Sequence, residues 1–167
     1  MKSYQQVIKR INGECQLIDQ VITRAMHAWR EGSKEPDIQN IYLDSVALNL
    51  HGFYNGLERL FELIAKYIDG SLPSGKNWHI NLLDQVANNY KDLRPAVISP
   101  KTRMYLDEFR RFRHIVRNVY TTSLAPEKMK SMMTNLPELW KQLTAELQAF
   151  SDFLEHVENN YKQLSEV

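Results

Sequence analysis

The stretch LDEFRRFRHIVRNVY, which occupies residues 106–120, carries the pattern from which the fold of the chain is predicted. Its apolar residues recur at three- and four-residue spacings: Leu106, Phe109, Val116 and Tyr120. This period predicts an amphipathic helix that buries one face against other helices. Arg113 occupies the position between Phe109 and Val116 on that face. A buried arginine is costly unless a partner or ligand meets its charge, so Arg113 is the first candidate functional residue.

A polar stripe runs beside this apolar face. At about 100° per residue, Arg103, Arg110 and Arg117 recur at heptad spacing, with His114 and Asn118 one step round the helix. Cationic, hydrogen-bonding and apolar groups therefore meet on one predicted helix, and core packing alone does not explain that combination.

The rest of the chain predicts further helices of the same amphipathic kind. We expect helices at residues 2–30, 37–69 and 100–120, a shorter one that starts at Trp78 and ends before Pro95, a short one near 127–134 and a long one near 137–161. Ser99 suits a helix N-cap, and a proline follows it. Pro126 and Pro137 each suit a first helical turn, whereas Gly70 suits the residue after a helix end. Gly13, inside the first predicted helix, costs up to about 1 kcal/mol relative to alanine, so packing must hold that turn.

These elements predict an all-α fold, an up-and-down four-helix bundle with an additional short helix. No segment alternates apolar and polar residues in the manner of a strand. With 167 residues, of which 43% are apolar and 25% charged, we expect one globular domain over residues 1–167.

Composition restricts the classes of function. A net charge of +1 lacks the overall basic signature of a nucleic-acid-binding protein, so any such binding must come from the local stripe on residues 100–120. The single Cys15 excludes an internal disulfide and zinc sites built from several cysteines. No apolar run approaches the roughly 18 residues of a membrane span, and no signal peptide is recognisable, so we expect a cytoplasmic protein without membrane association.

The remaining titratable residues offer weaker candidates. The five histidines are scattered one to a helix without metal-ligand spacing, so we expect no metal site and no cofactor. We interpret His51 and His79 as satisfied core or boundary residues. Asp44, Glu58 and Glu62 could form a cluster, but carboxylates at such spacings are more often solvated or paired with a residue such as Arg59.

Two interpretations of the 100–120 helix remain open. A charged, solvated helix face explains Arg103, Arg110 and Arg111 but not Arg113. The second interpretation groups the predicted site: Arg113, His114, Arg117, Asn118 and Tyr120. Arginine binds phosphate through two parallel hydrogen bonds, histidine transfers protons near neutral pH, and Tyr or Asn can orient a phosphate or hydroxyl. Such a set suits phosphodiester binding or metal-free cleavage of RNA.

Residues 112–120, FRHIVRNVY, closely resemble the signature of HepT-like proteins in the HEPN superfamily. These proteins are small all-α ribonucleases whose motif is an arginine, four residues, a histidine, one residue and a tyrosine. Residues 50–59 and 72–79 also resemble the second bundle helix and the lead into the third helix of such proteins, so the resemblance covers nearly the whole chain.

Carried over by position, the motif arginine is Arg113, the motif tyrosine is Tyr120, and the motif histidine falls on Asn118. The resemblance implies metal-independent cleavage of RNA in a composite cleft of a homodimer. Asparagine cannot act as a general base near pH 7, and His114, one turn earlier, could supply the imidazole. Arg110 and Arg117 would extend the RNA track. If His114 does not point into the site, the chain would be a non-catalytic dimer that binds RNA or its partner.

The resemblance also implies a partner, a small nucleotidyltransferase antitoxin of the MntA type. In such pairs the antitoxin silences the toxin by adding AMP to the motif tyrosine, which makes Tyr120 the expected target. The RNA substrate, for which tRNA or mRNA are the candidates, is not defined by the sequence. A third alternative is a bundle whose arginines only solvate it.

Overall fold

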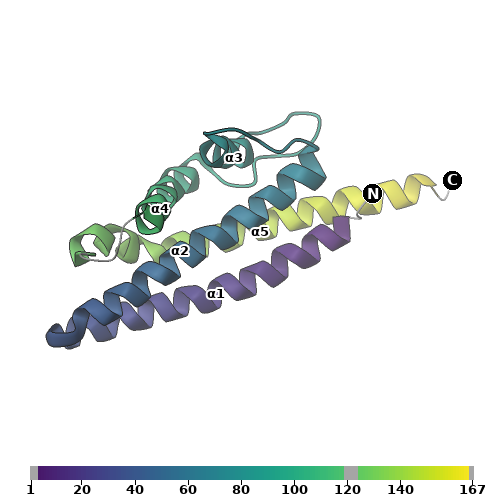
Figure 1. Cartoon of the computed structure of the whole chain (residues 1–167). Coiled ribbons are helices and arrows are strands. Elements are labelled where there is room, and N and C mark those ends of the chain that lie inside the picture. Colours follow the sequence, from purple (N-terminus) through teal and green to yellow (C-terminus); the bar gives the residue numbers. More distant parts are fainter. Residues whose placement is uncertain (1–3, 119–123, 166–167) are drawn as a thin grey trace.

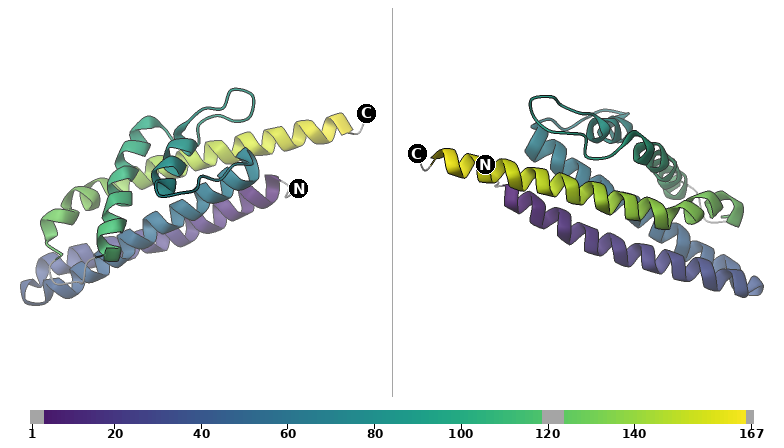
Figure 2. Two further views of the ribbon diagram at one scale, coloured as in Figure 1. Left: turned by 45° about the horizontal axis from the view of Figure 1, so that its top comes forward. Right: turned by 180° about the vertical axis from the view of Figure 1, so that it is seen from behind.

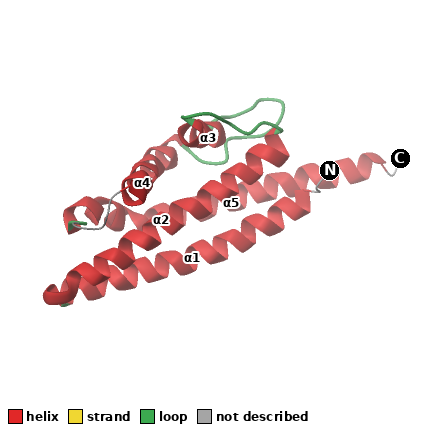
Figure 3. Ribbon diagram, viewed as in Figure 1, coloured by secondary structure: helices red, strands yellow, loops and turns green. Residues whose placement is uncertain are grey.

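The computed structural model describes residues 4–118 and 124–165, of which the side chains of Arg117, Asn118 and Ser165 are not described. The helices are α1 (Tyr4–Lys34), α2 (Gln39–Ile64), α3 (Trp78–Ala87), α4 (Pro100–Asn118) and α5 (Pro126–Ser165), with the short turns η1 (Pro36–Ile38) and η2 (Ala65–Asp69). These described parts contain no strand (Figure 3), which confirms the all-α prediction.

The long helices form a bundle in which the chain direction alternates. α1 packs along α2, and α5 lies alongside α1, while α4 lies over α2 and also contacts α5 (Figures 1 and 2). α1 and α4 run broadly one way, and α2 and α5 run the other way, as expected for the predicted up-and-down bundle. The short helix α3 packs on α2 and α4. Within the described ranges, none of the helices combines the length and apolar character needed to cross a membrane.

Helix ends follow the predicted local signals at two places. α2 continues through η2 to Gly70, whose φ of 66° is the left-handed conformation that glycine adopts most readily. At the start of α4, the hydroxyl of Ser99 accepts a hydrogen bond of 3.2 Å from the backbone N–H of Thr102. This is the N-cap that the sequence predicts, and it fixes where α4 begins.

Pro137 corrects a sequence prediction. The two helices expected near 127–134 and 137–161 are one continuous helix, α5, with Pro137 inside it. Proline removes one intrahelical hydrogen bond and normally ends or kinks a helix. The residues on both sides are deeply buried, among them Met133, Leu136 and Leu139. Packing of this face into the core outweighs the local cost, so the proline does not divide the helix.

The loop between α3 and α4 is held by Arg94, which is 2% exposed. Its Nη2 donates to a carboxylate oxygen of Asp69 at 2.7 Å, and its guanidinium also donates to the backbone carbonyls of Gln85, Asn88 and Pro95. One buried side chain thus ties the end of α2 to both sides of the loop. This arrangement fixes α3 on the bundle, and with it the residues at the start of α3.

α1 and α2 approach each other closely at Gly56. A Cβ atom at this position would lie 2.7 Å from Cγ1 of Ile18, which is fully buried. By contrast, a Cβ atom on Gly13 would meet nothing within 4 Å, so Gly13 has no packing reason to be glycine.

These two glycines give opposite expectations for stability. Gly13→Ala should stabilise the protein by up to about 1 kcal/mol, because alanine loses less backbone entropy in a helix. Gly56→Ala should destabilise it by about 1–3 kcal/mol, because the added methyl forces α1 and α2 apart. Urea unfolding followed by circular dichroism measures both free energies. Changes of the same sign in the two variants would contradict the described packing.

Candidate functional site

Arg113 meets a buried carboxylate. Its Nη1 lies 2.7 Å from Oε1 of Glu58 on α2, and the side chains of Arg113 and Glu58 are 15% and 7% exposed. The prediction that an arginine on the apolar face of this helix needs a partner is therefore confirmed. The prediction that Glu58 is solvated or paired with Arg59 is wrong, because Arg59 instead forms an ion pair with Glu14 on α1.

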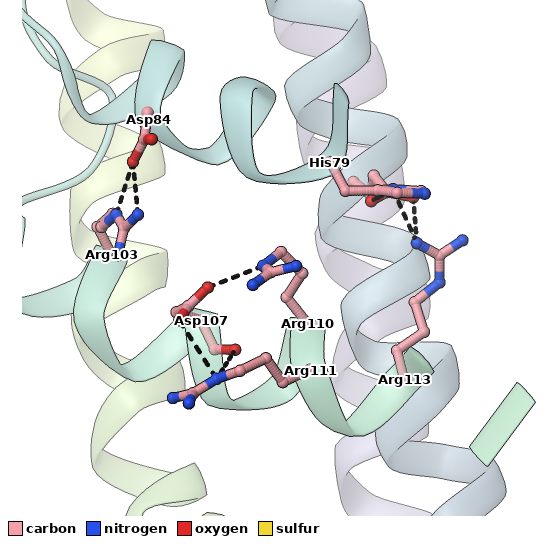
Figure 4. A network of polar contacts seen from close by, with 8 residues as sticks. His79, Asp84, Arg103, Asp107, Arg110, Arg111 and Arg113 are labelled. Atoms are coloured by element: carbon pink, nitrogen blue, oxygen red, sulfur yellow. Dashed lines mark hydrogen bonds and ion pairs between the residues drawn. The ribbon is translucent and has the colours of Figure 1, made fainter. Parts of the chain in front are cut away.

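His79, in the first turn of α3, completes this group. Its Nδ1 lies 2.6 Å from the second carboxylate oxygen of Glu58 and 3.1 Å from Nη1 of Arg113. Figure 4 shows the guanidinium of Arg113 directed toward His79. The sequence-based interpretation of His79 as a boundary residue with its hydrogen bonds satisfied missed the contacts of His79 with these two charged side chains. We call Glu58, His79 and Arg113 the Glu58 cluster.

Packing of α4 on α2 sets the register of the cluster. The rings of Phe53 and Phe109 meet edge to face with centroids 5.0 Å apart, and both side chains are fully buried. Arg113 follows Phe109 by one helical turn, which brings it opposite Glu58. Tyr54, one turn before Glu58, is also buried, and burial together with the charge of Glu58 raises the pKa of its hydroxyl well above the usual range. Tyr54 therefore remains neutral.

The geometry defines the tautomer of His79. Glu58 is in an ion pair with Arg113, and a carboxylate can only accept hydrogen bonds. The 2.6 Å contact therefore requires a proton on Nδ1 of His79. In the neutral ring, Nε2 then carries the lone pair and is directed away from Glu58. Nη1 of Arg113 donates to Oε1 of Glu58, and because Nδ1 of His79 already carries a proton, the 3.1 Å approach of Nη1 to Nδ1 is a close contact.

A shallow pocket lies beside the cluster. It is lined by His79, Arg110, Arg113 and His114, and its volume is about 40 Å³. Arg110, whose side chain is 21% exposed, is paired with Asp107 on the same helix at 2.8 Å. Two guanidinium groups and two imidazoles therefore surround one depression, which is the chemistry that binds an oxyanion such as phosphate.

Two further arginines of α4, Arg103 and Arg111, are paired with carboxylates. Arg103 pairs with Asp84 on α3 at 2.6 Å, and Arg111 contacts Asp107 at 3.3 Å (Figure 4). Neither lines the pocket beside Arg113. Arg111, whose side chain is 65% exposed, fits the solvated-face interpretation, whereas Arg103 is partly buried in an ion pair with α3 and Arg113 is held by the buried carboxylate on α2.

The structure brings together part of the site predicted from the sequence. Arg110, Arg113 and His114 line one pocket, and His79 and Glu58 join them. Arg117 and Asn118 belong to the last turn of α4, where their side chains are not described, and Tyr120 lies outside the described residues. Their contribution to the site stays a prediction.

Metal binding and thiol chemistry are two other activities that the described residues could have supported. Among those residues there is no group of three or more His, Cys, Asp or Glu side chains that could hold a metal ion. Burial, reinforced by the charge of Glu14, raises the pKa of the Cys15 thiol to about 11. The thiol is therefore protonated at neutral pH and is a poor nucleophile.

Comparison with protein families relates the chain to known proteins. A family model described as HepT-like protein matches residues 45–154, a segment that contains the whole Glu58 cluster. Neither the curated proteins nor the solved structures include a significant match to the chain.

The ion pair in the cluster generates a stability prediction. Glu58→Gln should destabilise the protein by about 3 kcal/mol, because it leaves the buried charge of Arg113 without a counter-charge. Glu62→Gln, one turn later on the same helix, is the matched control and should change stability by less than about 0.5 kcal/mol.

The double variant Glu58→Gln/Arg113→Met separates pairing from burial. Removing both charges should restore most of the stability lost in Glu58→Gln. Additive losses in chemical unfolding, with no coupling between the two positions, would contradict a buried ion pair.

Proposed function

Because the chain belongs to the HepT-like family of the HEPN superfamily, we propose that it is a toxin that cleaves RNA without a metal ion. The observation that carries this proposal is Arg113, a guanidinium held by the buried Glu58 at a pocket lined with imidazoles and a second arginine. Arg113 is also the residue to which the resemblance assigns the motif arginine, which supports the same site.

Each site residue has a proposed role. Arg113 binds the scissile phosphate and stabilises the charge that develops on it, and Arg110 and Arg117 extend the track for the RNA backbone. His114 is a proton-transfer group at the pocket, Asn118 orients the substrate by hydrogen bonding, and Tyr120 is both a site residue and a regulatory target. We propose that two copies of the chain form a homodimer with a composite cleft.

RNA cleavage in the presence of EDTA tests this function. Purified protein is incubated with total RNA, alongside Asn118→His and His114→Ala variants. Cleavage by the wild type supports the ribonuclease. Activity that appears only in Asn118→His would instead indicate a scaffold that has lost its chemistry.

A second candidate function is a non-catalytic dimer that binds RNA or its partner. It is favoured by Asn118, which stands where the motif has a histidine and cannot accept a proton near neutral pH. In this case the protein would still bind RNA most tightly at low salt, because phosphate contacts dominate such binding.

The proposed regulation concerns Tyr120. A nucleotidyltransferase antitoxin of the MntA type would add AMP to its hydroxyl, and the added phosphate would compete with RNA for Arg113 and Arg117. We expect mass spectrometry after incubation with such a partner and ATP to locate AMP on Tyr120. Modification at another residue, or unchanged modification of Tyr120→Phe, would contradict this target.

Substitution of Arg113 gives the prediction that bears most directly on the site. Arg113→Lys keeps a positive charge near Glu58, which limits the loss of stability, but it removes the planar fork that binds phosphate. We expect growth inhibition on expression to be lost. Arg111→Lys, with its side chain 65% exposed and away from the pocket, is the matched control and should remain toxic.

Expression levels and thermal unfolding of both variants confirm that they are folded. A toxic, well-expressed Arg113→Lys protein would remove Arg113 from the proposed site.

A further inference from the structure

An imidazole in contact with Arg113 belongs to His79, which lies outside the motif. Its Nδ1 is 2.6 Å from a carboxylate that is almost fully buried, while its own side chain is 28% exposed. A buried carboxylate that holds Nδ1–H fixes the ring orientation and makes Nε2 the proton acceptor. The same carboxylate would stabilise the imidazolium that forms when Nε2 takes a proton.

We propose that His79, oriented by Glu58, is the general base of the cleavage reaction, in the role that Asn118 cannot fill. This inference rests on the proposed ribonuclease function. It adds a catalytic residue from α3 to a site otherwise built on α4.

The position of His79 suits this role. Its ring packs on the indole of Trp78 with centroids 3.6 Å apart, which restricts the plane of the imidazole. It lines the same pocket as Arg110, Arg113 and His114. Because Nη1 of Arg113 is already bound to Glu58 and lies 3.1 Å from Nδ1, a phosphate bound to the outer edge of the guanidinium would be adjacent to the imidazole.

The proposed step is an internal transesterification of RNA. Nε2 of His79 takes the proton of a ribose 2′-hydroxyl as the 2′-oxygen attacks the neighbouring phosphorus. The new 2′-O–P bond forms as the P–O5′ bond breaks, and water gives a proton to the leaving 5′-oxygen. The hydroxide that remains takes the proton from Nε2 of His79, which returns water and the neutral imidazole. The products are a 2′,3′-cyclic phosphate and a 5′-hydroxyl end, with no net oxidation or reduction.

His114 is the competing imidazole in the same pocket. It lies on the exposed face of α4. The buried carboxylate of Glu58 binds His79, and this contact gives His79 a defined tautomer. The assignment therefore predicts that the larger loss of rate follows substitution of His79.

Kinetics with a fluorogenic single-stranded oligoribonucleotide in EDTA test the assignment in the full chain. His79→Gln, which keeps a hydrogen-bond donor near Glu58, should lower the rate at saturating RNA by at least about 100-fold. Its affinity for RNA and its thermal unfolding should change little, because Arg113 and its ion pair remain. His156→Gln, an exposed substitution on α5, is the matched control and should retain the wild-type rate.

Chemical rescue adds a readout that a structural role would not affect. Imidazole in solution should restore part of the activity of His79→Ala but none of the activity of Arg113→Lys.

The outcomes separate the inference from the proposed function. If the wild type cleaves and His79→Gln stays within about threefold of it, or loses RNA binding or folding instead of rate, His79 is not the base and the ribonuclease function stands. Loss of activity in His114→Gln with His79→Gln spared would assign the role to His114. If the wild type does not cleave the oligoribonucleotide, the ribonuclease function fails and the inference fails with it.

Discussion

The buried charge of Glu58 is the constraint on which the site depends. A carboxylate in the interior of a helical bundle is stable only when hydrogen bonds and a positive charge replace its hydration. Here α3 supplies the imidazole of His79 and α4 supplies the guanidinium of Arg113. α2, α3 and α4 thus meet at one point, and the contacts of this single carboxylate position two of the four side chains that line the pocket, His79 and Arg113.

This arrangement links stability to function. Side chains that are already held in one rotamer lose little conformational entropy when they bind a substrate. The electrostatic interaction of a buried carboxylate with its partners is also less screened by solvent than that of a surface carboxylate. Arg113 contributes to both, because one of its terminal nitrogens binds Glu58 and its side chain also lines the pocket. In the proposed ribonuclease, Arg113 is the motif arginine, and Asn118 in the motif histidine position would leave proton transfer to an imidazole from elsewhere in the fold.

Sequence reasoning predicted the elements that local signals define and missed those that depend on distant contacts. The bundle, the cap at Ser99 and the need of Arg113 for a partner all followed from periodicity and charge. Glu58 was misjudged because i,i+4 spacing suggested a surface pair, whereas its partner His79 lies 21 residues further along. The signal was present, since Glu58 sits among apolar residues on a buried helix face, as Arg113 does. Pro137 was misjudged because core packing overrides its local preference.

The tautomer of His79 tests the central claim most directly. In a histidine-selective ¹⁵N NMR spectrum of the protein at neutral pH, the account predicts that the proton of the neutral ring is on Nδ1 and that Nε2 is unprotonated, with this preference lost in Glu58→Gln. A His79 ring that carries its proton on Nε2 would contradict the account, because Nδ1 would then accept from Arg113 and Glu58 would not orient the ring for proton transfer.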